Sequence, residues 1–154
     1  NIEKLKSDVD YINNHIRNND KLNDWDIINF GRCFDNCNTQ KYILKNNNKL
    51  PGIVKSDFPK CRHAYAVSRK GANNIIKYSL PLYNIPGDRK ISLEGKKGNI
   101  NIFSTTPPLF FQNRSEFKTT LENNAKRVKE CSDHSELYTK DLSMRNHVEE
   151  CYIY

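Results

Sequence analysis

The sequence has no long hydrophobic run: no stretch approaches the roughly 18 consecutive apolar residues of a membrane-spanning helix. It contains only 6 glycines, no internal repeat and, near its beginning, no apolar segment typical of a secretory signal peptide. These absences exclude a collagen-like chain and a helical membrane channel. The mean hydropathy is low, at −0.83. Together with the absence of an initial Met, this favours part of a longer protein, or a unit that depends on a partner.

What the chain has in quantity is asparagine, lysine and isoleucine: 21 Asn, 17 Lys and 14 Ile make up about a third of its 154 residues. All three have A/T-rich codons, which indicates an A/T-rich genome such as that of a giant virus or a protist. The same bias accounts for the net charge of +7. Because the basic residues are scattered along the sequence, we expect no nucleic-acid partner. The aromatic content of 10% argues against a fully disordered chain.

The apolar pattern predicts short strands that alternate with helices. Apolar residues spaced by three and four positions from Ile2 to Ile16 predict an amphipathic helix over 2–18. The other expected elements are strands at 25–30, 61–67 and 100–103, helices at 69–78 and 115–130, irregular chain over 38–59, a loop over 80–88 and extended chain over 107–112. This alternation favours an α/β layer fold. Three short strands are too few for a complete doubly wound sheet but would suit its second half.

The segment from Cys61 to Asp88 carries the strongest candidate chemistry. A strand passes into a helix whose N-cap is Ser68, and Gly71 lies in the first turn. Small residues at a helix N-terminus allow a phosphate to approach the backbone. The alternative is that Gly71 only permits close packing of the helix on the sheet. The pattern by itself leaves both interpretations open.

Two polar residues at the ends of irregular segments are further candidates. Asp88 follows Ile85-Pro86-Gly87, and a rigid loop that presents one carboxylate suits a catalytic base or a metal ligand. The alternative is an exposed turn aspartate. Gln112 ends the run that begins at Pro107, where it either points an amide into a cleft or lies on the surface.

The five cysteines allow several interpretations. Cys33 and Cys61 lie near the ends of two expected strands, so a disulfide between them would join these strands and would indicate an oxidising compartment. Cys33, Cys37, Cys61 and His63 would supply four zinc ligands, although their spacing is unlike the usual CxxC pattern. Free buried thiols are the third alternative.

Four segments resemble, in order and approximate spacing, signatures of glycosyltransferase family 25. That family contains bacterial lipooligosaccharide galactosyltransferases and eukaryotic procollagen galactosyltransferases. The segments are WDIINFG at 25–31, HAYAVSRKGA at 63–72, LP at 80–81 with PGD at 86–88, and PPLFFQ at 107–112. Gly87 stands where the family usually has Val. The resemblance covers residues 1–117 and leaves 118–154 as a helical C-terminal extension.

The resemblance implies a GT-A-type nucleotide-sugar transferase fold of which this chain is the C-terminal half. It implies an inverting transfer of a hexose from a UDP-sugar to a hydroxyl acceptor on a glycan or a protein. Mn²⁺ would be held by an acidic motif outside this chain, so that the chain alone would be inactive and contain no metal ligands. Asp88 would be the base or would orient the acceptor. The expected cleft residues are His63, Tyr65, Ser68, Gly71 and Gln112.

A different function remains open from the sequence. A non-catalytic glycan-binding or assembly module derived from the same fold would share these segments without transferring sugar. The sequence also leaves the compartment open between the cytoplasm, in a viral-factory-like setting, and the lumen of the secretory pathway. The triplet Asn113-Arg114-Ser115 is compatible with the lumen. The sugar, the acceptor and the oligomeric state are not predicted.

Overall fold

The computed structural model describes residues 2–32, 35, 39–47 and 49–110, together with two short strands at 126–128 and 151–153. In chain order the elements are α1 (Ile2–Asn18), the 3-10 helix η1 (Asp20–Leu22), β1 (Ile27–Gly31), β2 (Lys41–Leu44), β3 (Gly52–Lys55), β4 (Ala64–Val67), α2 (Arg69–Ser79), α3 (Gly87–Lys96), β5 (Ile102–Thr106), β6 (Lys126–Val128) and β7 (Cys151–Ile153).

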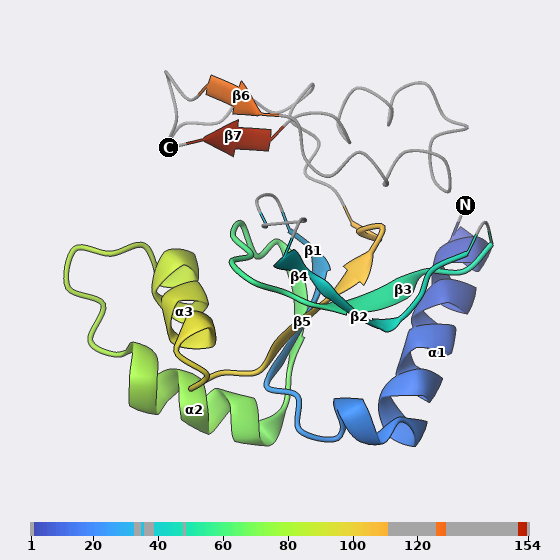
Figure 1. The fold of residues 1–154 in the computed structure, drawn as a ribbon, viewed down its shortest axis with the longest axis horizontal. Coiled ribbons are helices and arrows are strands. Elements are labelled where there is room, and N and C mark those ends of the chain that lie inside the picture. The colour runs from blue at the N-terminus through green and yellow to red at the C-terminus, as the bar shows by residue number, and fades with distance from the viewer. Residues whose placement is uncertain are drawn as a thin grey trace.

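Five of the strands form one mixed sheet with the order β2-β3-β5-β1-β4. The central strands β1 and β5 are parallel, and the pairs β1–β4, β3–β5 and β2–β3 are antiparallel. The strands β1 and β5 therefore end at the same edge of the sheet at which β4 begins. We call this the carboxyl edge; it is the upper edge of the sheet in Figure 1. The opposite edge is the amino edge. β6 and β7 form a separate antiparallel pair.

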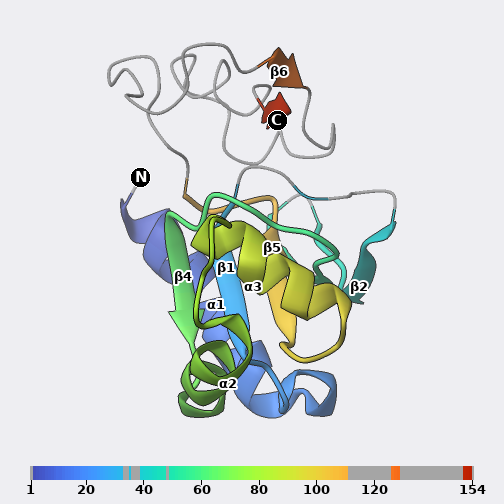
Figure 2. The same ribbon diagram turned by 90° about the vertical axis from the view of Figure 1, so that its left-hand side faces the viewer.

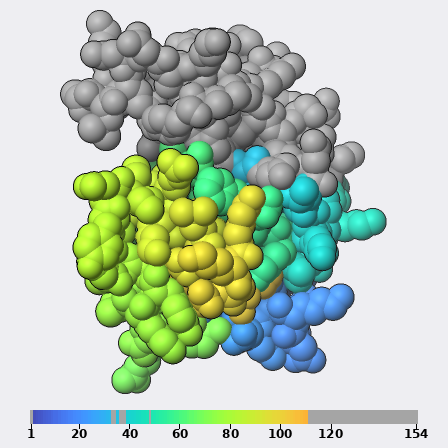
Figure 3. Space-filling view, turned by 60° about the vertical axis from the view of Figure 1, so that its left-hand side comes forward, coloured from blue at the N-terminus to red at the C-terminus, as the bar shows by residue number. Residues whose placement is uncertain are grey.

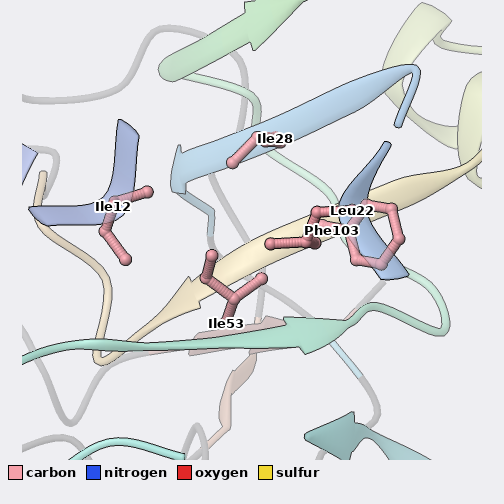
Figure 4. Packing of buried hydrophobic residues seen from close by; sticks show 5 residues of the cluster. All are labelled: Ile12, Leu22, Ile28, Ile53 and Phe103. Atoms are coloured by element: carbon pink, nitrogen blue, oxygen red, sulfur yellow. The ribbon is translucent and has the colours of Figure 1, made fainter. Parts of the chain in front are cut away.

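Helices cover both faces of the five-stranded sheet. Figures 1 and 2 show α1 on one face and α2 with α3 on the other. The apolar stripe of α1 places Ile12 in a cluster with Leu22, Ile28, Ile53 and Phe103, all at most 4% exposed. These five side chains point toward one another in Figure 4. Burial of this kind stabilises a fold by about 25 cal/mol per Å² of apolar surface.

The face under α2 and α3 changes character along the strands. Ile27 and Ile102 pack with Ile75 of α2 and Ile91 of α3 near the amino edge. Side chains two positions apart share a face of a strand, so Asn29 and Ser104 follow on that same face toward the carboxyl edge. There Asn29 Nδ2 donates a hydrogen bond to Ser104 Oγ at 3.2 Å. This layer of the fold is thus apolar at one end and polar at the other.

The mixed α/β class and the most regular elements agree with the sequence. The helix predicted at 2–18 is confirmed with the same bounds. The helix predicted at 69–78 is α2, which extends to Ser79, with Ser68 as its N-cap. The three predicted strands are β1, β4 and β5, each displaced by one to three residues at one or both ends.

Two expectations need correction: residues 38–59 are not irregular throughout, and the loop expected over 80–88 is shorter by its last two residues. Residues 38–59 contain β2 and β3, and β3 lies inside the sheet, paired with both β2 and β5. The loop ends at Pro86, which is the N-cap of α3, and α3 begins at Gly87. Of the helix expected over 115–130 the structure describes only 126–128, which form strand β6.

Candidate functional site

The carboxyl edge contains a strained residue held by two predicted site residues. Cys61 has a φ of +52°, in the left-handed region that non-glycine residues rarely adopt. Its backbone N–H donates to Asp88 Oδ2 at 2.9 Å. Its carbonyl oxygen lies 2.6 Å from His63 Nδ1. We call Cys61, Arg62, His63 and Asp88 the Cys61 corner. A left-handed residue costs on the order of 1–3 kcal/mol and persists only where its surroundings hold it.

His63 connects this corner to two further segments. Its Nε2 lies 2.9 Å from the carbonyl oxygen of Phe110. A Cβ at Gly31 would lie 2.4 Å from the same Nε2, so only glycine allows the imidazole to pack this closely on the end of β1. Both neighbours of the ring are acceptors, so both contacts are hydrogen bonds only when both nitrogens carry hydrogen. His63 therefore acts as a brace between segments rather than presenting a free ring nitrogen.

The four segments that carry the resemblance thus approach one another at His63. Gly31 ends the first segment, His63 begins the second, Asp88 ends the third and Phe110 belongs to the fourth. Gln112, which the sequence placed in the same cleft, lies outside the described residues.

Asp88 lies in the first turn of α3 and is half-buried. Its Oδ1 accepts a hydrogen bond from the backbone N–H of Arg89 at 2.7 Å, while its Oδ2 accepts that of Cys61. Each oxygen of an ionised carboxylate accepts about two hydrogen bonds, so both retain capacity for a further donor. The carboxylate is therefore fixed in position and can still accept a proton from a hydroxyl group.

The sequence did not single out Arg62, which contributes the positive charge of the corner. Its Nη2 donates to Ser92 Oγ on α3 at 3.3 Å. Its Nε and Nη1 are buried without a hydrogen-bond partner. Burial lowers the pKa of Arg62 to about 10, and the nearby charge of Asp88 opposes this effect. The guanidinium therefore remains charged at neutral pH.

A buried ion pair lies at the same edge. Arg32 follows β1, and its Nε donates to Asp35 Oδ2 at 3.1 Å, with both side chains at most 2% exposed. Arg32 Nη1 also donates to the carbonyl of Thr105 at 2.7 Å. The other carboxylate oxygen, Asp35 Oδ1, accepts the backbone N–H groups of Asp57 and Phe58. The pair thereby joins the chain after β1 to the chain after β3.

Ser68 and Gly71 do not belong to this site, which corrects the sequence-based expectation. The Ser68 hydroxyl accepts the Gly71 N–H at 2.8 Å and donates to the carbonyl of Trp25 at 2.9 Å. A Cβ at Gly71 would lie 2.1 Å from the carbonyl oxygen of Asp26, so this glycine allows close packing of α2. Because β4 crosses the sheet, Ser68 lies at the amino edge, about 16 Å from His63 at 3.3 Å per residue.

Tyr65 lies on β4, between these two edges. It is paired with Asn29 in the register of β1 and β4, so the two side chains share the face covered by α2 and α3. Tyr65 is 51% exposed because β4 is the last strand of the sheet. Its ring is therefore accessible to solvent near the Cys61 corner, on the face of the sheet that α2 and α3 cover.

Acidic residues of the first segment instead stabilise the amino edge. Asp26 is 1% exposed, and its Oδ2 accepts the backbone N–H of Asn101 at 2.7 Å. Its Oδ1 lies 3.1 Å from Lys70 Nζ, and Asp24 also pairs with this lysine. Burial would lower the pKa of Lys70, but the hydrogen bonds to Asp24 and Asp26 outweigh it and raise that pKa. This network joins the starts of β1 and β5 to α2.

The structure tests the expected disulfide and zinc site only in part, because some of the cysteines lie outside the described residues. Cys61 is a free, half-buried thiol, so the disulfide proposed between Cys33 and Cys61 is not formed in the structure. Cys33 and Cys37 themselves lie outside the described residues. Both ring nitrogens of His63 contact carbonyl oxygens, which disfavours its proposed role as a zinc ligand. The part of the chain that the structure describes contains no group of three or more side chains that could hold a metal ion.

A hollow of about 490 Å³ lies elsewhere, at the C-terminal end of α1. It is lined by Asn14, His15, Asn18, Asn19, Asp20 and Lys21. These residues lie beside the amino edge, at the bottom of Figure 1. The hollow therefore does not belong to the Cys61 corner.

The chain matches no protein-family model, no curated protein and no solved structure. No helix among the described residues combines the length and the apolar character needed to cross a bilayer. Function is therefore inferred from the geometry of the carboxyl edge and from the residues that form it.

Proposed function

We propose that this chain forms one wall of the cleft of a glycosyltransferase similar to family 25. In this proposal a longer protein transfers a hexose from a UDP-sugar to a hydroxyl group of a glycan or protein acceptor, with inversion. One observation carries the proposal: four segments that are separate in the sequence converge on His63. Gly31 packs against its ring, Phe110 and Cys61 lie at its two nitrogens, and Asp88 binds the Cys61 peptide.

Asp88 is the residue that we propose as the base. Its carboxylate takes the proton of the acceptor hydroxyl while that oxygen forms a bond to the anomeric carbon. The bond from the anomeric carbon to the diphosphate breaks, and UDP leaves with the bonding electrons. The hydrogen bonds from Cys61 and Arg89 fix the direction of the carboxylate, which lowers the entropic cost of reaching the reactive geometry.

The other residues of the corner then have supporting roles. His63 is a positioning residue, because its nitrogens contact Cys61 and Phe110 rather than solvent. Tyr65 offers an exposed ring for stacking on a sugar or a base. The Mn²⁺ ligands that the resemblance implies would lie outside this chain, so no step of this mechanism is assigned to the metal.

The test is turnover of UDP-hexose by the full-length protein, measured as release of UDP. Asp88→Asn keeps the shape of the side chain and one acceptor oxygen but removes the base. We expect transfer to fall by about 10²–10⁴-fold, the usual contribution of general base catalysis. Asp20→Asn, at the exposed start of η1, is the matched control and should leave turnover unchanged. Full activity of Asp88→Asn would remove Asp88 as the base.

The bonding of Asp88 also favours a second candidate function. Both of its oxygens accept backbone N–H groups, which is what a purely structural tether between α3 and Cys61 would do. In that case the chain is a glycan-binding or assembly module without transfer activity. Binding of an acceptor glycan by the full-length protein, with no release of UDP from any UDP-hexose, would favour this alternative.

A further inference from the structure

The carboxyl end of the layer between the sheet and α2–α3 contains a positive charge without a counter-ion in contact. Arg62 takes part in none of the ion pairs formed by the described residues. Its Nε and Nη1, which carry three of the five N–H donors of a guanidinium, have no partner. Leaving a buried charge uncompensated costs several kcal/mol in a folded protein.

The hydrogen-bond partner of Arg62 is a hydroxyl group on α3. Ser92 Oγ accepts from Nη2 and in turn donates to the carbonyl of Pro59. Elsewhere in the same layer Asn29 and Ser104, on the strands, and Ser56, just after β3, form a hydrogen-bonded chain, in which Asn29 Oδ1 is also buried without a partner. The region thus combines unused donors with hydroxyl groups, which suits a polar ligand better than an apolar side chain.

The start of α3 adds to the positive potential beside Arg62. This helix is 10 residues long, and its N-cap, Pro86, makes no side-chain hydrogen bond. The N-terminus of such a helix carries a partial positive charge and favours anions. Asp88 covers part of this end, since it accepts the N–H groups of Arg89 and Cys61. In the space-filling view of Figure 3 the surface of α3 lies beside that of the segment 40–60, on the same face of the molecule.

We propose that Arg62 is an anion-binding residue that takes a phosphate group at the Cys61 corner. A planar guanidinium binds phosphate oxygens through paired hydrogen bonds, and Arg62 has the unused donors that this requires. The identification of that phosphate as the diphosphate of the sugar nucleotide rests on the proposed function. Nε and Nη1 are themselves buried, so a phosphate reaches them only when the side chains that cover them move aside.

The test is calorimetric titration of the full-length protein with inorganic pyrophosphate, UDP and uridine. Arg62→Met removes the charge, Arg62→Lys keeps the charge without the planar fork, and Arg69→Met removes an exposed arginine at the start of α2. We expect Arg62→Met to weaken pyrophosphate and UDP at least tenfold and Arg62→Lys to be intermediate. Arg69→Met should stay within twofold of the wild type, and uridine should bind all four proteins alike.

A thermal melt without ligand distinguishes a ligand site from a structural arginine. Because Arg62→Met removes a buried charge that forms no ion pair among the described residues, we expect its melting temperature to equal or exceed that of the wild type. A clear decrease would mean that Arg62 stabilises the fold through partners of its own, and it would overturn the inference. Equal affinity of the wild type and Arg62→Met for pyrophosphate would overturn it as well.

The same titrations separate this inference from the proposed function. Pyrophosphate binding that depends on Arg62, without UDP-hexose turnover, would support the anion site and contradict the transferase. Turnover with UDP affinity unchanged in Arg62→Met would support the transferase and contradict the anion site. Loss of pyrophosphate binding in Arg69→Met to the same extent would show a general charge effect and would also contradict the anion site.

Discussion

Replacing Gly71 by alanine tests whether this glycine serves packing or ligand binding. A Cβ at this position would lie 2.1 Å from the carbonyl oxygen of Asp26 and 2.7 Å from its carbonyl carbon, both backbone atoms that cannot rotate away. At an unobstructed helical position the same change stabilises a protein by up to about 1 kcal/mol. Adding atoms to a packed site lowers stability by about 1–3 kcal/mol. Because the added Cβ would meet backbone atoms, we expect a loss at the upper end of this range.

Gly87→Ala is the matched control, because Gly87 also lies in the first turn of a helix. Its Cβ would meet only the Leu82 side chain, at 3.8 Å, which is an ordinary contact. We therefore expect Gly71→Ala to be less stable than Gly87→Ala by about 2 kcal/mol or more. With a urea m-value of about 2 kcal/mol/M, this difference lowers the midpoint of unfolding by about 1 M.

The assay is urea unfolding followed by circular dichroism for the wild type and both variants. Equal midpoints for the two variants would refute the packing argument. If Gly71 instead admitted a phosphate to the helix N-terminus, Gly71→Ala would keep its stability and lose affinity for UDP. The two interpretations that the sequence left open thus predict opposite changes in two measurements.

Two further predictions concern buried carboxylates. Asp35→Ala leaves the Arg32 guanidinium, which is 2% exposed, without its ion-pair partner. We therefore expect the free energy of unfolding, measured in urea, to fall by about 3 kcal/mol. Asp10→Ala, at an exposed position, is the control and should change it by no more than about 0.5 kcal/mol. Hydrogen bonds from Lys97, Asn99 and Lys90 lower the pKa of Glu94 to about 2. Glu94→Gln should therefore cost about 1–2 kcal/mol at pH 7, and the difference from the wild type should disappear as the pH falls from about 4.5 toward 2. A difference that persists at pH 2 would contradict this explanation.

The elements that could be predicted from the sequence are those whose signals are local. The stripe from Ile2 to Ile16 lies within one helix, and the Ser68 cap lies three residues from the N–H that it accepts. Strand β3 has no such signal, because what makes its four residues a strand is pairing with β2 and β5 from distant parts of the chain. The two prolines and the glycine of 80–88 predict a loop throughout, whereas α3 begins at Gly87, directly after Pro86.

The candidate site could be predicted only in part for a related reason. Nearness in the sequence suggested that His63, Ser68 and Gly71 line one cleft. Because β4 crosses the sheet, it places His63 at the carboxyl edge and Ser68 and Gly71 at the amino edge. Conversely, the contact between the Cys61 peptide and Asp88 spans 27 positions and depends on where α3 packs. The burial of Arg62 is a tertiary property that no local pattern indicates.

The strained conformation at Cys61 explains why these features occur together. Its positive φ lets the two residues that follow reach different partners: Arg62 turns to Ser92 on α3, and His63 turns to Phe110 beyond β5. Asp88 and His63 hold the N–H and the carbonyl of Cys61, so the side chain that we propose as the base also maintains the turn. Burying Arg62 with two of its nitrogens unpaired costs free energy that an apolar residue at that position would avoid. The anion that we infer at the corner would account for both the strain at Cys61 and these unpaired donors.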